Sequence, residues 1–246
     1  MKTFQNESKR IKELMNLSSI NEGPELDVFP IDGDFNIGYD KEMSLSNPKH
    51  NSDFSRTRTD KRHSKHIGVD IFGKKGSPVV APVSGKIKTQ ENDTSGKVVI
   101  VQDKDGYCHF MGHLDTIIVE DGVVVFAGDK VGTVGNTGNA ISTSPHVHYN
   151  VYKCDSGFDS GEDPFKNLEK VKDKSPSDVS EPNDKEVADL LSIKGLSSLK
   201  DKLEDYFTSD DENKDMKDLE DDENKGIISL LIKKGEDFLK NVIDSF

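Results

Sequence analysis

Residues of metal-binding type are concentrated in three short stretches of this 246-residue chain. In SPHVHYNV, a β-favouring run, His146 and His148 are two residues apart, so both side chains point to the same face of a strand. HIGVDIFG places His66 four residues before Asp70, and MGHLD contains His113. Neutral imidazole and carboxylate are ordinary zinc ligands, and three of them with an open coordination position define a catalytic site.

Each of these patterns also has a plainer interpretation. A His-x-His pair on a strand often lies on the surface without a function, and His-x-x-x-Asp occurs by chance in many proteins. The residues alone therefore leave both interpretations open. No His-Glu-x-x-His helix and no Gly-x-Ser-x-Gly elbow is present, which excludes a thermolysin-like helix and a serine nucleophile of that type.

The elements that must position these residues are strands. Between Val28 and Leu168 the chain consists of short β-type runs broken by glycine, such as SPVVAPVSGKIKT and KVVIVQDKDGYCHF, with Asp105-Gly106 as a hairpin turn. This texture predicts a mainly β, antiparallel domain of the sandwich or barrel-sandwich type over residues 28–168.

The flanking segments have other patterns. Residues 1–27 are predicted to hold an amphipathic leader helix, and residues 169–186 are charged and proline-bearing, as in a linker. In residues 187–246 the apolar period becomes helical, which predicts a small acidic helical tail, best read as a helical hairpin. Two roles remain open for this tail: attachment to a virion or another protein partner, or a solvated acidic spacer.

Composition and the cysteine count limit which partners and cellular locations are expected for this protein. The net charge of −13 argues against binding of nucleic acid or anionic membrane through charge, and no apolar run is long enough to span a bilayer. The N-terminus has no apolar core followed by a cleavage site, so no secretory signal is expected. Cys108 and Cys154 allow at most one bridge, and two buried free thiols are the favoured expectation.

Three segments together resemble a known family. HIGVDIFGKKGSPVVAPVSGKI, MGHLD and VFAGDKVGTVGNTGNAISTSPHVHYNV follow one another in the order found in the lysostaphin-type (LytM-like) zinc endopeptidases. GEDPFKNL resembles the Asp-Pro that closes the family's domain, so the resemblance covers roughly residues 28–168.

This resemblance implies a role for each candidate residue. His66, Asp70 and His148 would be the zinc ligands, and His113 and His146 would be the catalytic residues that handle the reacting water. Bound zinc makes hydroxide available at neutral pH, while amide hydrolysis also needs stabilisation of an oxyanion and protonation of the leaving amine.

Other positions are less directly assigned. Met111 and Asn150 replace an aromatic and an acid that the family often has, which leaves substrate preference open. His109 shares strand parity with His113, so it lines the cleft or, the favoured expectation, is a half-exposed bystander. His50 and His63 lie in a basic stretch interpreted as a solvated loop, with attraction to an anionic wall polymer as the alternative. In the loop 134–145, glycines such as Gly135 and Gly138 would permit close approach of the backbone to a ligand.

The function implied by the resemblance is that of a zinc-dependent endopeptidase that cuts peptide stems or cross-bridges of bacterial peptidoglycan. The main alternative is a non-catalytic domain of the same fold that binds the wall or activates another hydrolase. A biotinyl- or lipoyl-carrier domain is disfavoured because no convincing modifiable lysine is present.

The biological setting is suggested by the N-terminal segment. NESKRIKELMNLSSINEG is similar to leader segments of tailed-phage structural proteins, so the expected setting is a virion-associated protein, or one released to act on the wall. The alternative is a bacterial hydrolase exported unconventionally.

Overall fold

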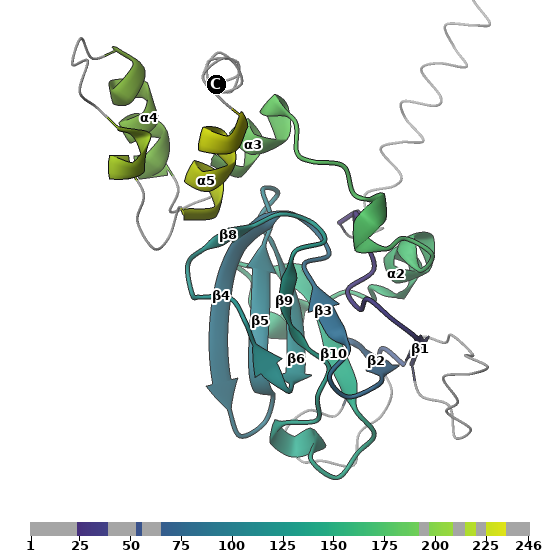
Figure 1. Cartoon of the computed structure of the whole chain (residues 1–246). Coiled ribbons are helices and arrows are strands. Elements are labelled where there is room, and N and C mark those ends of the chain that lie inside the picture. Colours follow the sequence, from purple (N-terminus) through teal and green to yellow (C-terminus); the bar gives the residue numbers. More distant parts are fainter. Residues whose placement is uncertain are drawn as a thin grey trace, which may run out of the picture.

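The structure is a computed structural model that describes residues 24–38, 53–55, 65–191, 197–208, 215–219 and 225–234. Two antiparallel sheets form its body, and helices follow toward the C-terminus (Figure 1). The strands are β1 (Phe35–Ile37), β2 (Val69–Gly73), β3 (Pro78–Val80), β4 (Gly85–Asn92), β5 (Gly96–Gln102), β6 (Tyr107–Leu114), β7 (Thr116–Ile117), β8 (Val124–Val125), β9 (Lys130–Thr133) and β10 (His146–Lys153). The α-helices are α2 (Phe165–Val171), α3 (Asp184–Leu191), α4 (Ser197–Thr208) and α5 (Lys225–Lys234). The short 3-10 helices are η2 (Gly138–Ala140), η3 (Phe158–Ser160), η4 (Pro176–Asp178) and η5 (Met216–Leu219). The predicted mainly β, antiparallel fold with a helical C-terminal segment is confirmed.

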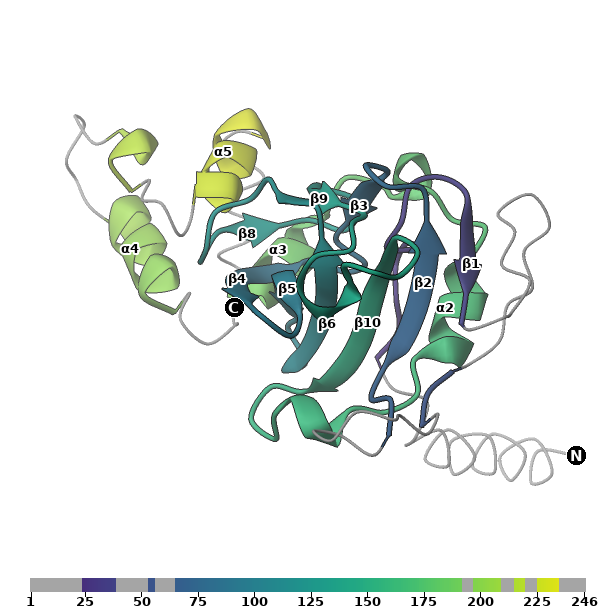
Figure 2. The same cartoon turned by 90° about the horizontal axis from the view of Figure 1, so that it is seen from below.

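The order of strands in the larger sheet brings the three candidate stretches together. Within the described residues this sheet runs β1-β2-β10-β6-β5-β4-β8, and a smaller sheet runs β3-β9-β7. Strand β10 therefore lies between β2 and β6, as Figure 2 shows. Its register pairs His148 with Asp70 on one side and with Gly112 on the other. Residues about 80 positions apart in the chain thus become cross-strand neighbours.

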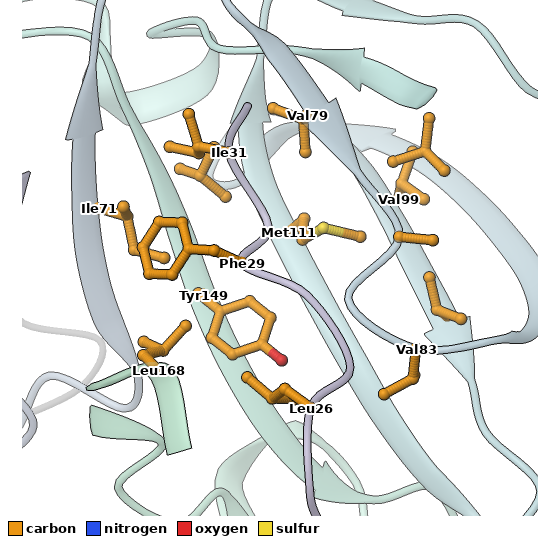
Figure 3. Close-up of a cluster of buried hydrophobic side chains, with 14 of the residues drawn as sticks. Leu26, Phe29, Ile31, Ile71, Val79, Val83, Val99, Met111, Tyr149 and Leu168 are labelled. Atoms are coloured by element: carbon orange, nitrogen blue, oxygen red, sulfur yellow. The ribbon is translucent and has the colours of Figure 1, made fainter. Parts of the chain in front are cut away.

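The two faces of the larger sheet have different environments. Along β10, Val147, Tyr149 and Val151 belong to the main hydrophobic core, which also includes residues of the smaller sheet. His146 and His148 alternate with them and therefore point to the opposite face. Figure 3 shows part of this core, with labelled residues that include Phe29, Ile71, Met111 and Leu168. The core thus holds the strands in register while the other face remains for the candidate site.

The helical tail packs on the edge of the larger sheet. Val124 of β8 is buried in a second hydrophobic cluster with Leu190 of α3, Leu203 of α4 and Ile228 of α5. Figure 1 shows these helices gathered beyond β8. The apolar faces predicted from the helical period are therefore buried against the chain's own sheet. None of the described helices is long and apolar enough to cross a membrane.

Some predicted boundaries differ from the observed elements. Helix α2 runs past the predicted domain end at residue 168, and Val171 is buried in the main core. The segment predicted as a linker, 169–186, therefore begins inside α2 and ends inside α3. Of the predicted leader helix 1–27, residues 24–27 are not helical and the rest lies outside the described residues, as do the last residues of the tail, 235–246.

The expectation of two free thiols was wrong. Cys108 and Cys154 form a disulfide, with their Cα atoms 5.1 Å apart. Cys108 lies on β6 opposite Tyr152 of β10, and Cys154 follows directly after the end of β10. The pairing depends on this cross-strand register, which the spacing of the cysteines along the chain does not reveal.

Candidate metal centre

Three ligand-type atoms converge on the face of the larger sheet that lies opposite the core. His66 Nε2 lies 3.0 Å from His148 Nδ1 and 3.1 Å from Asp70 Oδ1. His148 Nδ1 lies 3.0 Å from the same carboxylate oxygen. All three side chains are buried, and they form a group that could hold a metal ion. The structure therefore brings together the three residues that the sequence predicted as ligands.

A glycine allows this close approach. Gly68 lies between His66 and Asp70 in the chain and has a φ of +125°, a backbone conformation that L residues with side chains rarely adopt. A Cβ atom at this position would lie 2.7 Å from both His148 Nε2 and the carbonyl oxygen of Tyr149. The His-x-Gly-x-Asp spacing therefore has a steric reason, because a larger residue would push the segment before β2 away from β10.

The outer nitrogens of the two ligand imidazoles have partners that set their tautomers. His148 Nε2 lies 2.8 Å from the carbonyl oxygen of Ile67, so that nitrogen carries the hydrogen and donates it. His66 Nδ1 lies 3.1 Å from the carbonyl oxygen of Asp53 and 3.2 Å from its carboxylate. In the neutral rings the lone pairs of the inner nitrogens then point at Asp70 Oδ1. These partners match the outer hydrogen bonds that metal-bound histidines ordinarily make.

The triangle formed by His66 Nε2, Asp70 Oδ1 and His148 Nδ1 needs a cation. Two nitrogen lone pairs and a carboxylate oxygen repel one another at 3.0–3.1 Å unless a proton or a metal lies among them. A tetrahedral zinc with ligands at about 2.0–2.1 Å separates those ligands by about 3.3 Å. The observed edges are close to that value. The donor set, its tautomers and its size therefore fit a zinc ion.

The same atoms hold a proton strongly when no metal is bound. Burial alone would lower the pKa of His66, but hydrogen bonds and ionic attraction from Asp53 and Asp70 outweigh it and raise that pKa to about 9. Burial alone would raise the pKa of Asp70, but hydrogen bonds from His148 and His66 hold it well below its usual range. A metal that binds here therefore replaces a proton on His66.

His113 enters the site through an irregularity in its strand. The pairing of β5 with β6 shifts between Lys97↔Leu114 and Val99↔Met111, which leaves one extra residue on β6. His113 lies in this bulge, with a φ of 63°, and its backbone N–H donates to Ser95 at 2.8 Å. The bulge turns the side chain toward His148, with ring centroids 6.0 Å apart.

The electrostatic environment of His113 keeps its ring neutral. Burial lowers its pKa to about 3, and the positive charge of His146 and His148 in their protonated forms contributes to this shift. Its Nδ1–H donates to the carbonyl oxygen of Thr137 at 2.9 Å. His113 Nε2 is therefore an unprotonated acceptor at neutral pH.

His146 is held in a similar way. Its Nδ1–H donates to the carbonyl oxygen of Ser144 at 2.8 Å, and its Nε2 lies 3.8 Å from Asp70 Oδ1. The rings of His113 and His146 meet edge to face with centroids 4.9 Å apart. All five residues predicted for the site are therefore gathered in one place.

The sequence expectations for His109 were wrong. His109 neither lines the cleft nor is half-exposed, because it is fully buried on the core side of β6, with Nδ1 2.8 Å from the hydroxyl of Tyr149 and Nε2 3.2 Å from Asp103. Gly135 and Gly138 lie close to the chain's own backbone at residues 115 and 96, and their approach to a ligand stays a prediction. The predictions for His50 and His63 lie outside the described residues.

A cleft of about 320 Å³ opens beside the candidate metal site formed by His66, Asp70 and His148. His113 and His148 line one end, and Phe110, Tyr152 and Phe158 supply its apolar surface. These aromatic residues and Asp53 were not predicted from the sequence as part of the site. No signal marks them, because their positions depend on the fold of segments that are distant in sequence.

Comparisons with known proteins agree with this geometry. Residues 64–161 match the model of Peptidase family M23. The lipoprotein NlpD of Yersinia enterocolitica is 31% identical over 84 residues, which are 33% of this chain and 84% of that protein. The chain therefore belongs to Peptidase family M23, and it contains a buried His-Asp-His group that could hold a metal ion.

Further relatives are named for two different activities. Peptidoglycan DD-endopeptidase ShyA of Vibrio cholerae is 34% identical over 90 residues, 36% of this chain and 20% of that protein. Murein hydrolase activator NlpD of Salmonella dublin is 33% identical over 86 residues, 34% of this chain and 22% of that protein. The chain thus spans about a fifth of the length of the first curated relatives it matches. Among solved structures, the catalytic domain of lysostaphin from Staphylococcus simulans has 28% identity and a TM-score of 0.45, and the match covers 48% of this chain and 90% of that one.

Proposed function

We propose that this protein is a zinc-dependent endopeptidase that hydrolyses peptide stems or cross-bridges of bacterial peptidoglycan. The observation that carries the proposal is the convergence of His66, Asp70 and His148 on one point beside His113 and His146. Family membership and the endopeptidase among the relatives support the same substrate class.

His66 Nε2, Asp70 Oδ1 and His148 Nδ1 would hold the zinc ion. When bound, zinc supplies a Lewis acid that makes water more acidic and polarises a peptide carbonyl. The protein keeps the two imidazoles in the ligating tautomer through Asp53 and the carbonyl oxygen of Ile67.

His113 and His146 would carry the protons of the reaction. Each ring donates its Nδ1–H to a backbone carbonyl, so each Nε2 is left to accept a proton from the attacking water. The amine that leaves when the C–N bond breaks must gain a proton, and an imidazolium formed in the first step supplies it. Since the bulge and the loop fix both rings, the two groups keep this arrangement before the substrate arrives.

A specific comparison favours a second candidate. The activator NlpD is also a relative of this chain, so a role that binds the wall and stimulates another hydrolase is the alternative. The enzyme is preferred because the three ligand-type residues and both proton-carrying histidines are present together. An activator does not require His113 in a strained bulge with its pKa lowered to about 3.

The proposed setting is outside the reducing cytoplasm, in a virion or released onto the wall. The disulfide between Cys108 and Cys154 supports an oxidising environment. The similarity that motivates the phage setting lies in residues 6–23 of the predicted leader 1–27, and these residues are outside the described ones.

Digestion of purified peptidoglycan tests the function. The full chain is incubated with the substrate with and without a chelator, and the soluble fragments are identified by mass. We expect new amino and carboxyl ends from one type of peptide bond, lost with the chelator and restored by added zinc. Intact peptidoglycan in every sample, together with stimulation of a separate hydrolase, would favour the activator.

A further inference from the structure

Two clefts lie near the five-residue site. The first, here called the inner cleft, lies over β4, β5 and β6 and contains His113 and His148 at one end. The second, here called the edge cleft, has a volume of about 580 Å³ and lies beside Phe72, whose ring centroid is 5.1 Å from that of His146. The five-residue site therefore lies between them.

One loop connects the two clefts. Asn139 of the loop 134–145 lines the inner cleft, whereas Ser144 and Pro145 line the edge cleft. His146 follows Pro145 directly at the start of β10. A single extended peptide that passes over the site could therefore occupy both clefts, with the bond to be cut above the triangle.

The inner cleft is cationic. Lys65 and Lys88 line it, both are exposed, and none of the described residues that line it is acidic. The remaining polar lining includes Gln90, Thr94 and Ser95. No ion pair joins either lysine to a carboxylate in the described part of the chain, so both ammonium groups remain available to a ligand.

The edge cleft carries lysines as well. Lys74 and Lys75 line it, against Asp34 as the single carboxylate among its described lining residues. Lys75 already pairs with Asp115 at 3.0 Å, whereas Lys74 has no such pair within the described ranges. The register places Asn36 of β1 opposite Phe72 and two strands from His146, at the floor of this cleft.

Asn36 adds an acceptor to the edge cleft. Its side chain is 1% exposed, and its Oδ1 atom is buried without a hydrogen-bond partner among the described residues. A buried carbonyl oxygen of this kind is costly unless a donor reaches it. The N–H groups of an extended peptide are such donors, so this residue fits a peptide backbone in the edge cleft.

The charge of the clefts is opposite to the charge of the chain. The chain has a net charge of −13, yet the lining residues of the two clefts include four lysines and one carboxylate. Clefts lined by one sign of charge attract ligands of the opposite sign. We infer that the substrate is a peptide with free carboxylates on both sides of the scissile bond, as in acidic stem peptides, and not a neutral glycine-rich bridge. This inference rests on the proposed function.

The test compares two forms of one substrate. Purified cross-linked stem peptides with free carboxylates and the same peptides with those carboxylates amidated are digested by the full, zinc-loaded chain, and kcat/KM is measured for each. Two exposed ion pairs predict a preference of roughly two- to thirtyfold for the free acids. The preference should decrease as salt rises from about 0.05 to 0.5 M, because salt screens exposed charges.

Variants connect the preference to the clefts. Lys88→Gln and Lys74→Gln together should reduce it to less than about half its wild-type size, whereas Lys130→Gln should retain it, because Lys130 is an exposed residue of the smaller sheet. Equal kcat/KM for both forms in the wild type, or a full preference in the double variant, would overturn the inference while the proposed function stands. Hydrolysis of neither form, with purified peptidoglycan still cut, would overturn this inference alone, whereas intact peptidoglycan would overturn the proposed function with it.

Discussion

His66 donates its outer N–H toward Asp53, a residue thirteen positions earlier that is itself buried. The distances from Nδ1 are 3.1 Å to the carbonyl oxygen of Asp53 and 3.2 Å to its carboxylate. The other carboxylate oxygen accepts the backbone N–H of Asp70 at 3.1 Å. One carboxylate outside the triangle therefore orients two of its three members.

Asp53→Asn should weaken metal binding without removing a ligand. An amide cannot balance the charge that His66 shares with the metal, and loss of such an outer partner typically costs 10–100-fold in affinity. Competition with a chromophoric chelator measures the dissociation constant. Asp34→Asn, an exposed change, is the control. Equal affinity in Asp53→Asn and the wild type would show that the backbone carbonyl alone orients His66.

The metal-free protein should lose stability on the alkaline side. His66 has a pKa of about 9 in the folded chain and about 6.5 unfolded, so its contribution is fully present below pH 6.5 and is lost as pH rises through 9. This difference in the pKa of His66 between the folded and unfolded chain corresponds to at most about 3 kcal/mol in the free energy of unfolding. Thermal unfolding of chelator-treated protein between pH 6 and 10 measures the effect. His66→Gln should lack this decline, and an identical decline in that variant would contradict the assignment.

His113→Ala and His146→Ala should separate binding from turnover. Both side chains lie beside the triangle without belonging to it, so zinc should be retained while turnover falls by about 10²–10⁴-fold, the usual contribution of a proton-transfer group. Zinc analysis and peptidoglycan digestion on the same preparations measure the two effects. Wild-type turnover in both variants would exclude them from the reaction.

Reduction of the disulfide should lower the free energy of unfolding. The bridge between Cys108 and Cys154 closes a loop across 46 residues, for which chain entropy predicts about 4 kcal/mol and measured values are typically about 2–4 kcal/mol. Denaturant unfolding with and without reductant measures the loss. The double variant Cys108→Ser with Cys154→Ser should be insensitive to reductant. A wild-type protein that is equally insensitive would show that the bridge is absent.

The motifs predicted which residues meet, and the fold explains why. Alternation along β10 places His146 and His148 on one face, so local sequence was sufficient for this pair. Gly68 is required because His148 approaches it closely, and this explains the glycine in the His-x-Gly-x-Asp motif.

The remaining features depend on pairings between distant segments. Strand parity predicted that His109 and His113 share a face, but the bulge on β6 reverses that relationship. The disulfide likewise depends on the register of β6 with β10, and the contact from Asp53 comes from a segment that precedes β2. Spacing along the chain reveals neither of them. The tail helices were predicted from their period, whereas their burial against Val124 was not.

The zinc content of three proteins purified in parallel tests whether His66, Asp70 and His148 hold a zinc ion. These are the wild type, His148→Ala and His113→Ala, each analysed for bound zinc per chain after removal of loosely held metal. We expect about one equivalent in the wild type and in His113→Ala, and almost none in His148→Ala, with a native-like β signal in all three. Equal zinc in all three proteins, or none in the wild type at neutral pH with zinc supplied, would contradict it.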